Sequence, residues 1–257
     1  ICNGTATGGI TINASGGVAP LQYSINNGTT FQNSSTFNNV TANTYQIVVQ
    51  DANGCTQSSS IVVTQPTPVV ISSTPSVNVL CNGAATGTIT INANGGTAPL
   101  QYSINNGTTY QNGSTFNNLS AGNFQIIVQD ANGCTQTTAV SITQPTAVVI
   151  NSIPVVPVTC NGTPTGNIVI NANGGTAPLQ YSINNGSAYQ NSNTFNNLSA
   201  GNYQIVVQDA NGCTQTTSAS VTQPSAVVIA SSLPTPATCN GTATGSIVIN
   251  ANGGTAP

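Results

Sequence analysis

The chain has 257 residues, a formal net charge of −3 and no lysine, arginine or histidine. Without a cationic side chain it cannot pair with a nucleic-acid backbone or be drawn to an anionic membrane surface, so both classes of partner are excluded. Asp51, Asp130 and Asp209 carry the only charges apart from Cys and Tyr chemistry, and no apolar run is long enough to insert into a membrane. Such a neutral surface should respond little to pH and salt.

A unit of 79 residues repeats along the chain, and each copy carries two cysteines. The first cysteines lie 79 residues apart, at Cys2, Cys81, Cys160 and Cys239. The second cysteines follow 53 residues later, at Cys55, Cys134 and Cys213. This period predicts one structural module in tandem. With boundaries after each Gln-Pro pair, the copies are 1–66 (lacking its first strand), 67–145, 146–224 and a partial copy, 225–257.

Short alternations of apolar and polar residues follow one another in the second copy. They cover residues 88–93, 100–104, 124–129 and 140–143. Period-2 alternation rich in Ile, Val, Thr and aromatic residues predicts strands with one buried face, and no stretch has helical periodicity. The predicted inward-facing residues are Ile89, Ile91, Leu100, Tyr102, Ile104, Phe116, Leu119, Phe124, Ile126, Val128, Val140 and Ile142.

Turn residues separate these strands at regular intervals. Asn94-Gly95-Gly96 ends one strand, Asn106-Gly107 is a strong hairpin signal, and Asp130-Ala131-Asn132-Gly133 turns the chain between the last two strands. About seven short strands per copy predict an all-β fold, a tandem array of immunoglobulin-like antiparallel β-sandwich domains of about 79 residues each. Short junctions with proline and without glycine favour a stiff array.

Aromatic residues recur at two further positions. One position opens the penultimate strand, as in a tyrosine corner, at Tyr45, Phe124 and Tyr203. Because one copy has Phe, the ring rather than the hydroxyl is the essential part. The other position holds Phe31, Tyr110 and Tyr189. We expect these rings to pack in the core or on a hairpin, and a ligand-facing platform for sugars is the alternative.

The paired cysteines predict disulfides and an oxidising, extracytoplasmic compartment, because they lack the CxxC spacing and the histidines of a zinc site. The expected pairs lie within one copy: Cys2–Cys55, Cys81–Cys134 and Cys160–Cys213. In a regular immunoglobulin topology, however, the two cysteine loops sit at opposite poles. A bond to the next copy, such as Cys81–Cys213, therefore stays open. The partner of Cys239 is expected outside the chain, which we interpret as a segment of a longer protein.

Reactive chemistry is excluded by the residue types present. General acid–base catalysis needs His, Glu, Lys or a paired Asp, and each copy has one isolated Asp. A Ser or Cys nucleophile would have no basic partner. One carboxylate per copy is also poor for calcium, so we interpret each Asp as the residue that caps its turn. We predict no catalytic residue, no metal and no cofactor.

The strings "CNGxxTGxIxINAxGGTAPLQYSINNG" and "LSAGNxQIxVQDANGCT" recur in order through the copies. Together they resemble the SprB-type repeat of giant surface proteins in gliding Bacteroidetes. The resemblance implies a very long bacterial cell-surface filament, exported by the type IX route and engaged in adhesion or gliding. It implies no catalytic residues.

These observations favour a non-enzymatic structural and adhesive role. The main hypothesis is a stiff, disulfide-reinforced stalk within an extracellular filament or adhesin. An array of carbohydrate-binding modules is one alternative, with surface glycans as partners. Another is a self-assembling multi-chain fibre, in which the partners are other copies of the chain, joined laterally or end to end; low charge removes the repulsion that keeps edge strands apart.

Overall fold

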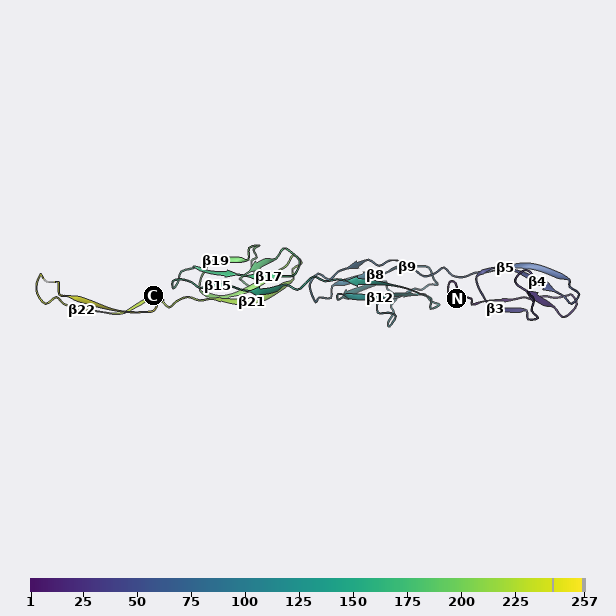
Figure 1. The fold of residues 1–257 in the computed structure, drawn as a ribbon, viewed down its shortest axis with the longest axis horizontal. Coiled ribbons are helices and arrows are strands. Elements are labelled where there is room, and N and C mark those ends of the chain that lie inside the picture. Colours follow the sequence, from purple (N-terminus) through teal and green to yellow (C-terminus); the bar gives the residue numbers. More distant parts are fainter. Residues whose placement is uncertain (242, 256–257) are drawn as a thin grey trace. The chain divides into compact units, whose positions relative to one another are not determined.

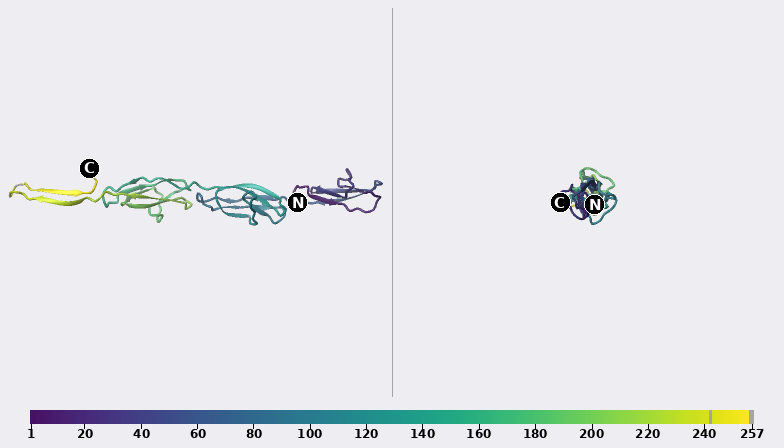
Figure 2. Two further views of the ribbon diagram at one scale, coloured as in Figure 1. Left: turned by 90° about the horizontal axis from the view of Figure 1, so that it is seen from below. Right: turned by 90° about the vertical axis from the view of Figure 1, so that its right-hand side faces the viewer.

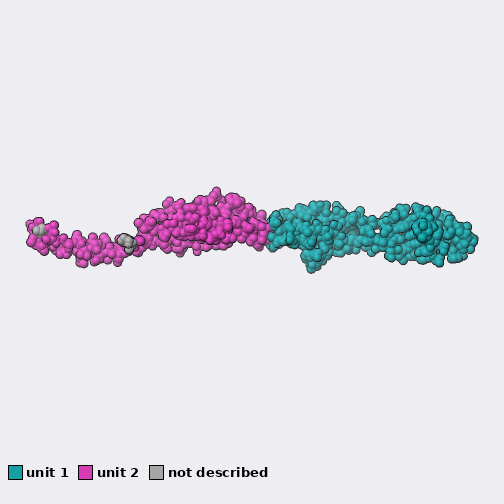
Figure 3. Space-filling model, in the orientation of Figure 1, with its two compact units in different colours: residues 1–78, 85–143 teal, residues 79–84, 144–257 magenta. Residues whose placement is uncertain are grey.

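The computed structural model describes residues 1–241 and 243–255, and the predicted fourth copy includes residues 242, 256 and 257, which lie outside this description. Among the described residues every regular element is a β-strand (Figure 1). The chain divides into two compact units, which are coloured separately in Figure 3. Unit 1 comprises residues 1–78 and 85–143, and unit 2 comprises residues 79–84 and 144–257.

The copies contain strands at corresponding positions. The first copy has β1 (Gly8–Thr11), β2 (Gln22–Ser24), β3 (Thr36–Val40), β4 (Asn43–Gln50) and β5 (Thr56–Val63). The second has β6 (Val70–Ser73), β7 (Ser76–Val77), β8 (Gly87–Thr90), β9 (Asn92–Asn94), β10 (Gln101–Ser103), β11 (Thr115–Leu119), β12 (Gly122–Gln129) and β13 (Thr135–Ile142). The third has β14 (Val149–Ser152), β15 (Val155–Val156), β16 (Gly166–Val169), β17 (Asn171–Asn173), β18 (Gln180–Ser182), β19 (Thr194–Leu198), β20 (Gly201–Gln208) and β21 (Thr214–Val221). The fourth has β22 (Val228–Thr235) and β23 (Ser246–Asn252).

Two antiparallel layers make up each complete copy. In the second copy one layer has the order β11-β8-β7 and is extended by the pair β6-β9, while the other has the order β10-β12-β13. The third copy repeats this arrangement with β19-β16-β15, β14-β17 and β18-β20-β21. The chain is therefore an all-β array of immunoglobulin-like sandwiches, and the predicted fold class is confirmed.

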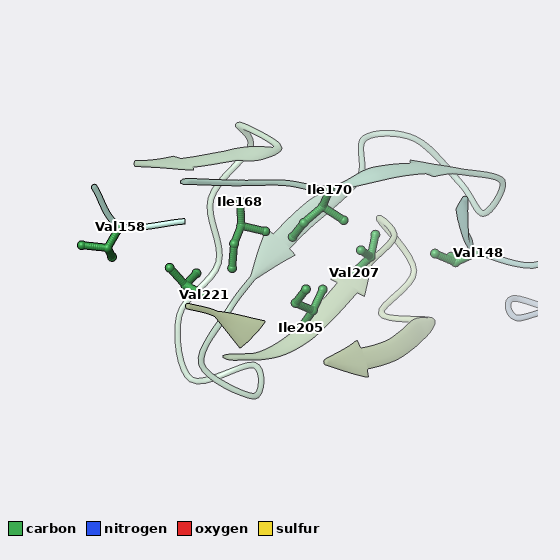
Figure 4. Close-up of a cluster of buried hydrophobic side chains, with 7 residues drawn as sticks. All are labelled: Val148, Val158, Ile168, Ile170, Ile205, Val207 and Val221. Atoms are coloured by element: carbon green, nitrogen blue, oxygen red, sulfur yellow. The ribbon is translucent and has the colours of Figure 1, made fainter. Parts of the chain in front are cut away.

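Apolar side chains from both layers meet in one core in each of the first three copies. In the third copy the buried cluster contains residues from β16, β20 and β21 and from their connections (Figure 4): Val148, Val158, Ile168, Ile170, Ile205, Val207 and Val221. In the second copy, the predicted inward residues Ile89, Ile91, Ile126, Val128 and Ile142 are buried, and the others of the predicted set are half-buried. The alternation pattern thus identified the inner faces of the strands correctly.

The predicted Asn-Gly turn is present, and a buried serine supports it. Asn106 and Gly107 both have positive φ, of 56° and 79°, as a type I′ turn requires. The hydroxyl of Ser103, which is 1% exposed, accepts a hydrogen bond from the Gly107 amide at 2.9 Å and donates one to Asn105 Oδ1 at 2.8 Å. Burying this polar group is tolerated because it is fully hydrogen-bonded.

The aromatic residue that opens the penultimate strand forms a tyrosine corner where a hydroxyl is present. Tyr45 donates to the carbonyl of Thr41 at 3.0 Å, and Tyr203 donates to the carbonyl of Ser199 at 2.8 Å. Phe124 occupies the same position in the second copy and is half-buried. The ring packs in all three copies, and the hydroxyl adds one local hydrogen bond.

We expect Phe124→Tyr to stabilise the second copy by about 1 kcal/mol, because its hydroxyl would reach the carbonyl of Ser120. Tyr203→Phe is the matched control and should destabilise the third copy by a similar amount. Urea unfolding of the full chain measures both changes. A destabilised Phe124→Tyr variant would show that the second copy has no room for the hydroxyl.

Candidate functional site: the junction between successive copies

The Cys-Asn-Gly loop of each copy is fastened to the end of that same copy. In the first copy the side chain of Asn3 donates to the carbonyl of Pro66 at 3.0 Å, and the amide of Gly4 donates to Gln65 Oε1 at 2.6 Å. Asn82 and Asn161 form the same bonds to Pro145 and Pro224. The first cysteine therefore lies at the pole where the Gln-Pro pair leads into the next copy.

The Asp-Ala-Asn-Gly turn lies between the last two strands, β12 and β13 in the second copy. Asp130, which is 5% exposed, accepts hydrogen bonds at Oδ1 from the amides of Asn132 (2.9 Å) and Cys134 (2.8 Å). Its other oxygen, Oδ2, accepts one from the amide of Thr97 at 2.9 Å. The predicted capping role of this Asp is confirmed, and the carboxylate also orients the second cysteine.

Hydrogen bonds of this kind lower the pKa of two of the aspartates, Asp51 and Asp130. The Val18 amide, followed by the Cys55 amide, holds the pKa of Asp51 below its usual 3.8. Desolvation of Asp130 raises its pKa, but hydrogen bonds from the amides of Thr97, Cys134 and Asn132 outweigh this effect, so the pKa again lies below 3.8. Both turns therefore favour the ionised carboxylate.

A depressed pKa in the folded state links stability to pH. The contribution of Asp51 and Asp130 is present above the unfolded-state value of 3.8 and is lost as the pH falls below it toward the folded pKa. We expect the unfolding temperature to be nearly constant from about pH 5 to 8, because the chain has no histidine, and to fall below about pH 4. Thermal unfolding followed by circular dichroism measures this profile. Asp130→Asn should reduce the fall in unfolding temperature below about pH 4. An unfolding temperature that rises in acid would contradict this expectation.

Two disulfides join the first cysteine of one copy to the second cysteine of the next. Cys2 is bonded to Cys134 and Cys81 to Cys213, each with a Cα–Cα distance of 5.5 Å and a sequence separation of 132 residues. Cys2–Cys134 lies within unit 1, and Cys81–Cys213 lies within unit 2, to which the loop 79–84 belongs.

The expected pairs within one copy, Cys2–Cys55, Cys81–Cys134 and Cys160–Cys213, are therefore wrong. The physical reason is the fastening of each Cys-Asn-Gly loop to its own Gln-Pro end, which places the two cysteines of one copy at opposite poles. The alternative bond, Cys81–Cys213, is the one present. Cys55 and Cys160 are exposed and form no disulfide in the structure.

A second contact accompanies each disulfide. Asn211 of the Asp-Ala-Asn-Gly turn donates from Nδ2 to the carbonyl of Leu80 at 3.1 Å and to Thr176 Oγ1 at 3.0 Å. Asn132 forms the same pair of bonds, to the carbonyl of Ile1 at 3.4 Å and to Thr97 Oγ1 at 2.9 Å. We call the disulfide, the aspartate turn and this asparagine the clasp. Sequence reasoning missed the asparagine, although its recurrence just before Gly-Cys was visible.

The aromatic residues considered as ligand-facing lie on the Asn-Gly hairpin. In all three copies the ring is half-buried. A Cβ built on Gly107 would lie 3.0 Å from the hydroxyl of Tyr110, and one built on Gly28 would lie 3.6 Å from the ring of Phe31. Tyr189 covers Gly186 in the same way. The rings thus pack on the turn, and a role toward a ligand stays a prediction.

A family model of the SprB repeat matches residues 1–30, 73–109, 152–188 and 231–257, which together are just over half of the chain. The chain belongs to the SprB repeat family. The matched segments contain the Cys-Asn-Gly loop of each copy and, in the second copy, the short strands β8, β9 and β10 that follow it. The suspected resemblance is confirmed, and it identifies an extracellular adhesive or structural repeat, in agreement with the disulfides.

A comparison of this SprB repeat chain with curated proteins found no match. The solved structures that match this chain include Drosophila OTK extracellular domains 3–5, with 13% identity, a TM-score of 0.29 and coverage of 79% of this chain and 85% of that one. The N-terminal eight Ig domains of the Down syndrome cell adhesion molecule have 13% identity, a TM-score of 0.39 and coverage of 80% and 33%. The S-layer protein rSbsC has 14% identity, a TM-score of 0.27 and coverage of 90% and 43%.

The described part of the SprB repeats contains no candidate for a membrane-spanning helix or for a metal site with several ligands. The regular elements of residues 1–241 and 243–255 are all strands, so these residues form no helix that could span a membrane. Over the same residues, no three His, Cys, Asp or Glu side chains lie close enough to hold a metal ion together. The clasp is the recurring arrangement of side chains that joins successive copies.

Proposed function

We propose that this chain is a tension-resistant stalk segment of a long extracellular filament or adhesin, in which each clasp fastens one repeat to the next. The domain boundaries after Pro66, Pro145 and Pro224 belong to this proposal, as do a cell-surface position in a bacterium and export by the type IX route. The observation that carries it is the pairing of successive copies by Cys2–Cys134 and Cys81–Cys213.

The two disulfides overlap in sequence, and this overlap limits how far the chain can be pulled. The shortest covalent path from Cys2 to Cys213 crosses the first disulfide to Cys134, follows the backbone to Cys81, and crosses the second disulfide. That path contains only the 53-residue span from Cys81 to Cys134, whereas the backbone alone spans 211 residues. At about 3.6 Å per residue, the extended length is roughly 190 Å instead of roughly 760 Å.

Force spectroscopy on the full chain, attached at residues 1 and 224, tests this role. We expect the fully extended length of the oxidised chain to be about 570 Å shorter than that of the chain reduced with dithiothreitol. The reason is that 158 fewer residues can extend between Cys2 and Cys213. Cys160→Ser is the matched control and should leave the difference unchanged. Equal extension of both forms would overturn the proposed role.

A further inference from the structure

Asparagine followed by glycine is a chemically reactive pair, and this chain is rich in it. The main-chain nitrogen of the glycine can attack the side-chain amide of the asparagine, because glycine has no Cβ to hinder the approach. The attack requires a glycine N–H without a hydrogen bond and a backbone that is free to rotate. The second copy contains five such pairs: Asn82-Gly83, Asn94-Gly95, Asn106-Gly107, Asn112-Gly113 and Asn132-Gly133.

In three of these pairs the glycine amide donates a hydrogen bond within its own copy. The acceptors are Gln144 Oε1 for Gly83 (2.8 Å), Ser103 Oγ for Gly107 (2.9 Å) and the Asp130 carbonyl for Gly133 (3.0 Å). The corresponding amides of the first and third copies donate the same bonds. Such a nitrogen cannot turn toward the asparagine until its hydrogen bond opens, so these pairs are protected.

The pair Asn94-Gly95 is held by strand pairing and close packing instead. Asn94 is the last residue of β9 and pairs with Val70 of β6. A Cβ built on Gly95 would lie 1.9 Å from the carbonyl oxygen of Pro68, so the chain before β6 lies directly against this glycine. The backbone here cannot rotate unless β6 separates from β9, and this pair is therefore protected as well.

The pair Asn112-Gly113 has neither kind of protection. It lies in the connection between β10 and β11, in the teal part of the ribbon in Figure 2, and both residues are exposed. The carbonyl of Gly113 accepts a hydrogen bond from Gln111 Nε2 at 2.7 Å, but its amide donates none to any described residue. Asn112 Oδ1 accepts a hydrogen bond from Gln101 Nε2 at 3.3 Å, which polarises the side-chain amide.

We propose that Asn112 is a deamidation site, and that hydrogen bonds to the glycine amides protect Asn82, Asn106 and Asn132 from the same reaction. Hydroxide removes the proton of the Gly113 amide, and the nitrogen attacks Cγ of Asn112. The Cγ–Nδ2 bond breaks, Nδ2 leaves as ammonia with a proton from water, and a five-membered imide remains. Water then adds to one of the two imide carbonyls and opens the ring, which gives aspartate or isoaspartate.

The protected asparagines include those that hold the repeats together. Asn82 Nδ2 donates to the carbonyl of Pro145, and Asn132 Nδ2 donates to Thr97 Oγ1 within the clasp. Deamidation of either would place a carboxylate, which only accepts, where a donor is required. At position 112 a carboxylate can still accept the hydrogen bond from Gln101. The inference rests on the chemistry of these amides and not on the proposed resistance to tension.

Incubation of the full oxidised chain in mildly alkaline buffer, followed by isoelectric focusing and mass spectrometry, tests the proposal. We expect a new form whose net charge is −4 instead of −3. Chymotrypsin cleaves after Tyr110 and Phe116 and releases residues 111–116, which contain only one Asn-Gly pair. This peptide should carry the change, and a digest made before incubation corrects for conversion during digestion.

The other pairs provide the comparison of rates. Asn82, Asn106 and Asn132 should convert at least about tenfold more slowly than Asn112, because a local opening free energy of about 1.4 kcal/mol already gives that factor. In urea with dithiothreitol the rates should become similar. If Asn112 of the folded chain converts no faster than Asn106, the proposal is wrong.

The repeats supply a matched pair of variants at the site itself. The first and third copies have Ser34 and Ser192 in place of Gly113. In the third copy Gln180 Nε2 donates to Asn191 Oδ1 at 3.2 Å, so the surroundings of the asparagine are the same. Gly113→Ser should abolish the rapid conversion, and Ser192→Gly should create a second site at Asn191. A Ser192→Gly chain in which Asn191 stays unconverted would overturn the assignment of the site.

Gln144→Ala tests the protection. Gln144 is exposed, and its side chain is the acceptor for the Gly83 amide. The substitution should therefore raise the rate of conversion at Asn82 toward that of Asn112, while the rate at Asn132 stays the same. An unchanged rate at Asn82 would show that the hydrogen bond does not protect this pair.

Discussion

Replacing Cys213 by serine should lower the free energy of unfolding of the third copy by up to about 4–5 kcal/mol. The bond from Cys81 to Cys213 closes a loop with a sequence separation of 132 residues, and loop-closure entropy gives stabilisation of this size for so long a loop. The Asp209 carboxylate accepts a hydrogen bond from the Cys213 amide at 2.8 Å and so helps to hold this cysteine in place. Urea unfolding of the full oxidised chain, with and without the substitution, measures the loss.

Two controls separate the disulfide from other effects of Cys213→Ser. Cys160→Ser removes an exposed cysteine that forms no disulfide and should change stability by less than about 0.5 kcal/mol. Cys81→Ser removes the other half of the bond and should match Cys213→Ser. If Cys81→Ser is as stable as the unsubstituted chain, the bond does not stabilise the folded state in solution.

The strands and turns of this protein were predictable because their signals are local. Alternation at 88–93 and 124–129 identified the buried faces, since the side chains of a strand point alternately to its two sides. Asn106-Gly107 identified a turn because both residues tolerate positive φ. The core residue Val158 was missed because it lies in a connection, where no alternation marks it.

The disulfide partners were not predictable from spacing, because the decisive contacts join residues far apart in sequence. Gly4 and Gln65 are 61 residues apart, and their hydrogen bond holds the first cysteine at the far pole of its copy. The immunoglobulin topology predicts that the two cysteine loops of a copy lie at opposite poles. It does not predict the hydrogen bonds that hold the Cys-Asn-Gly loop against the Gln-Pro pair. The role of the clasp asparagine depends on the same pairing of copies, because Asn211 donates its hydrogen bond to the carbonyl of Leu80 in the preceding copy.

Gly174→Ala should destabilise the third copy by about 2–5 kcal/mol. Gly174 has φ +79°, and a Cβ there would lie 1.8 Å from the carbonyl oxygen of Ala147, just before β14. The left-handed backbone alone costs about 1 kcal/mol for a residue with a Cβ, and the rest arises because β14 must move away from β17. Hydrogen exchange of the full chain locates the effect, with faster exchange expected in β14 and β17 and no change in the second copy.

Gly16→Ala separates these two contributions. Gly16 holds the corresponding position in the first copy with the same left-handed backbone, but nothing lies within 4 Å of its built Cβ. The chain should therefore lose only about 1 kcal/mol on this substitution. A Gly174→Ala loss no larger than that of Gly16→Ala would show that β14 adjusts freely. A larger loss would show that glycine is required at position 174 because the chain just before β14 passes over it.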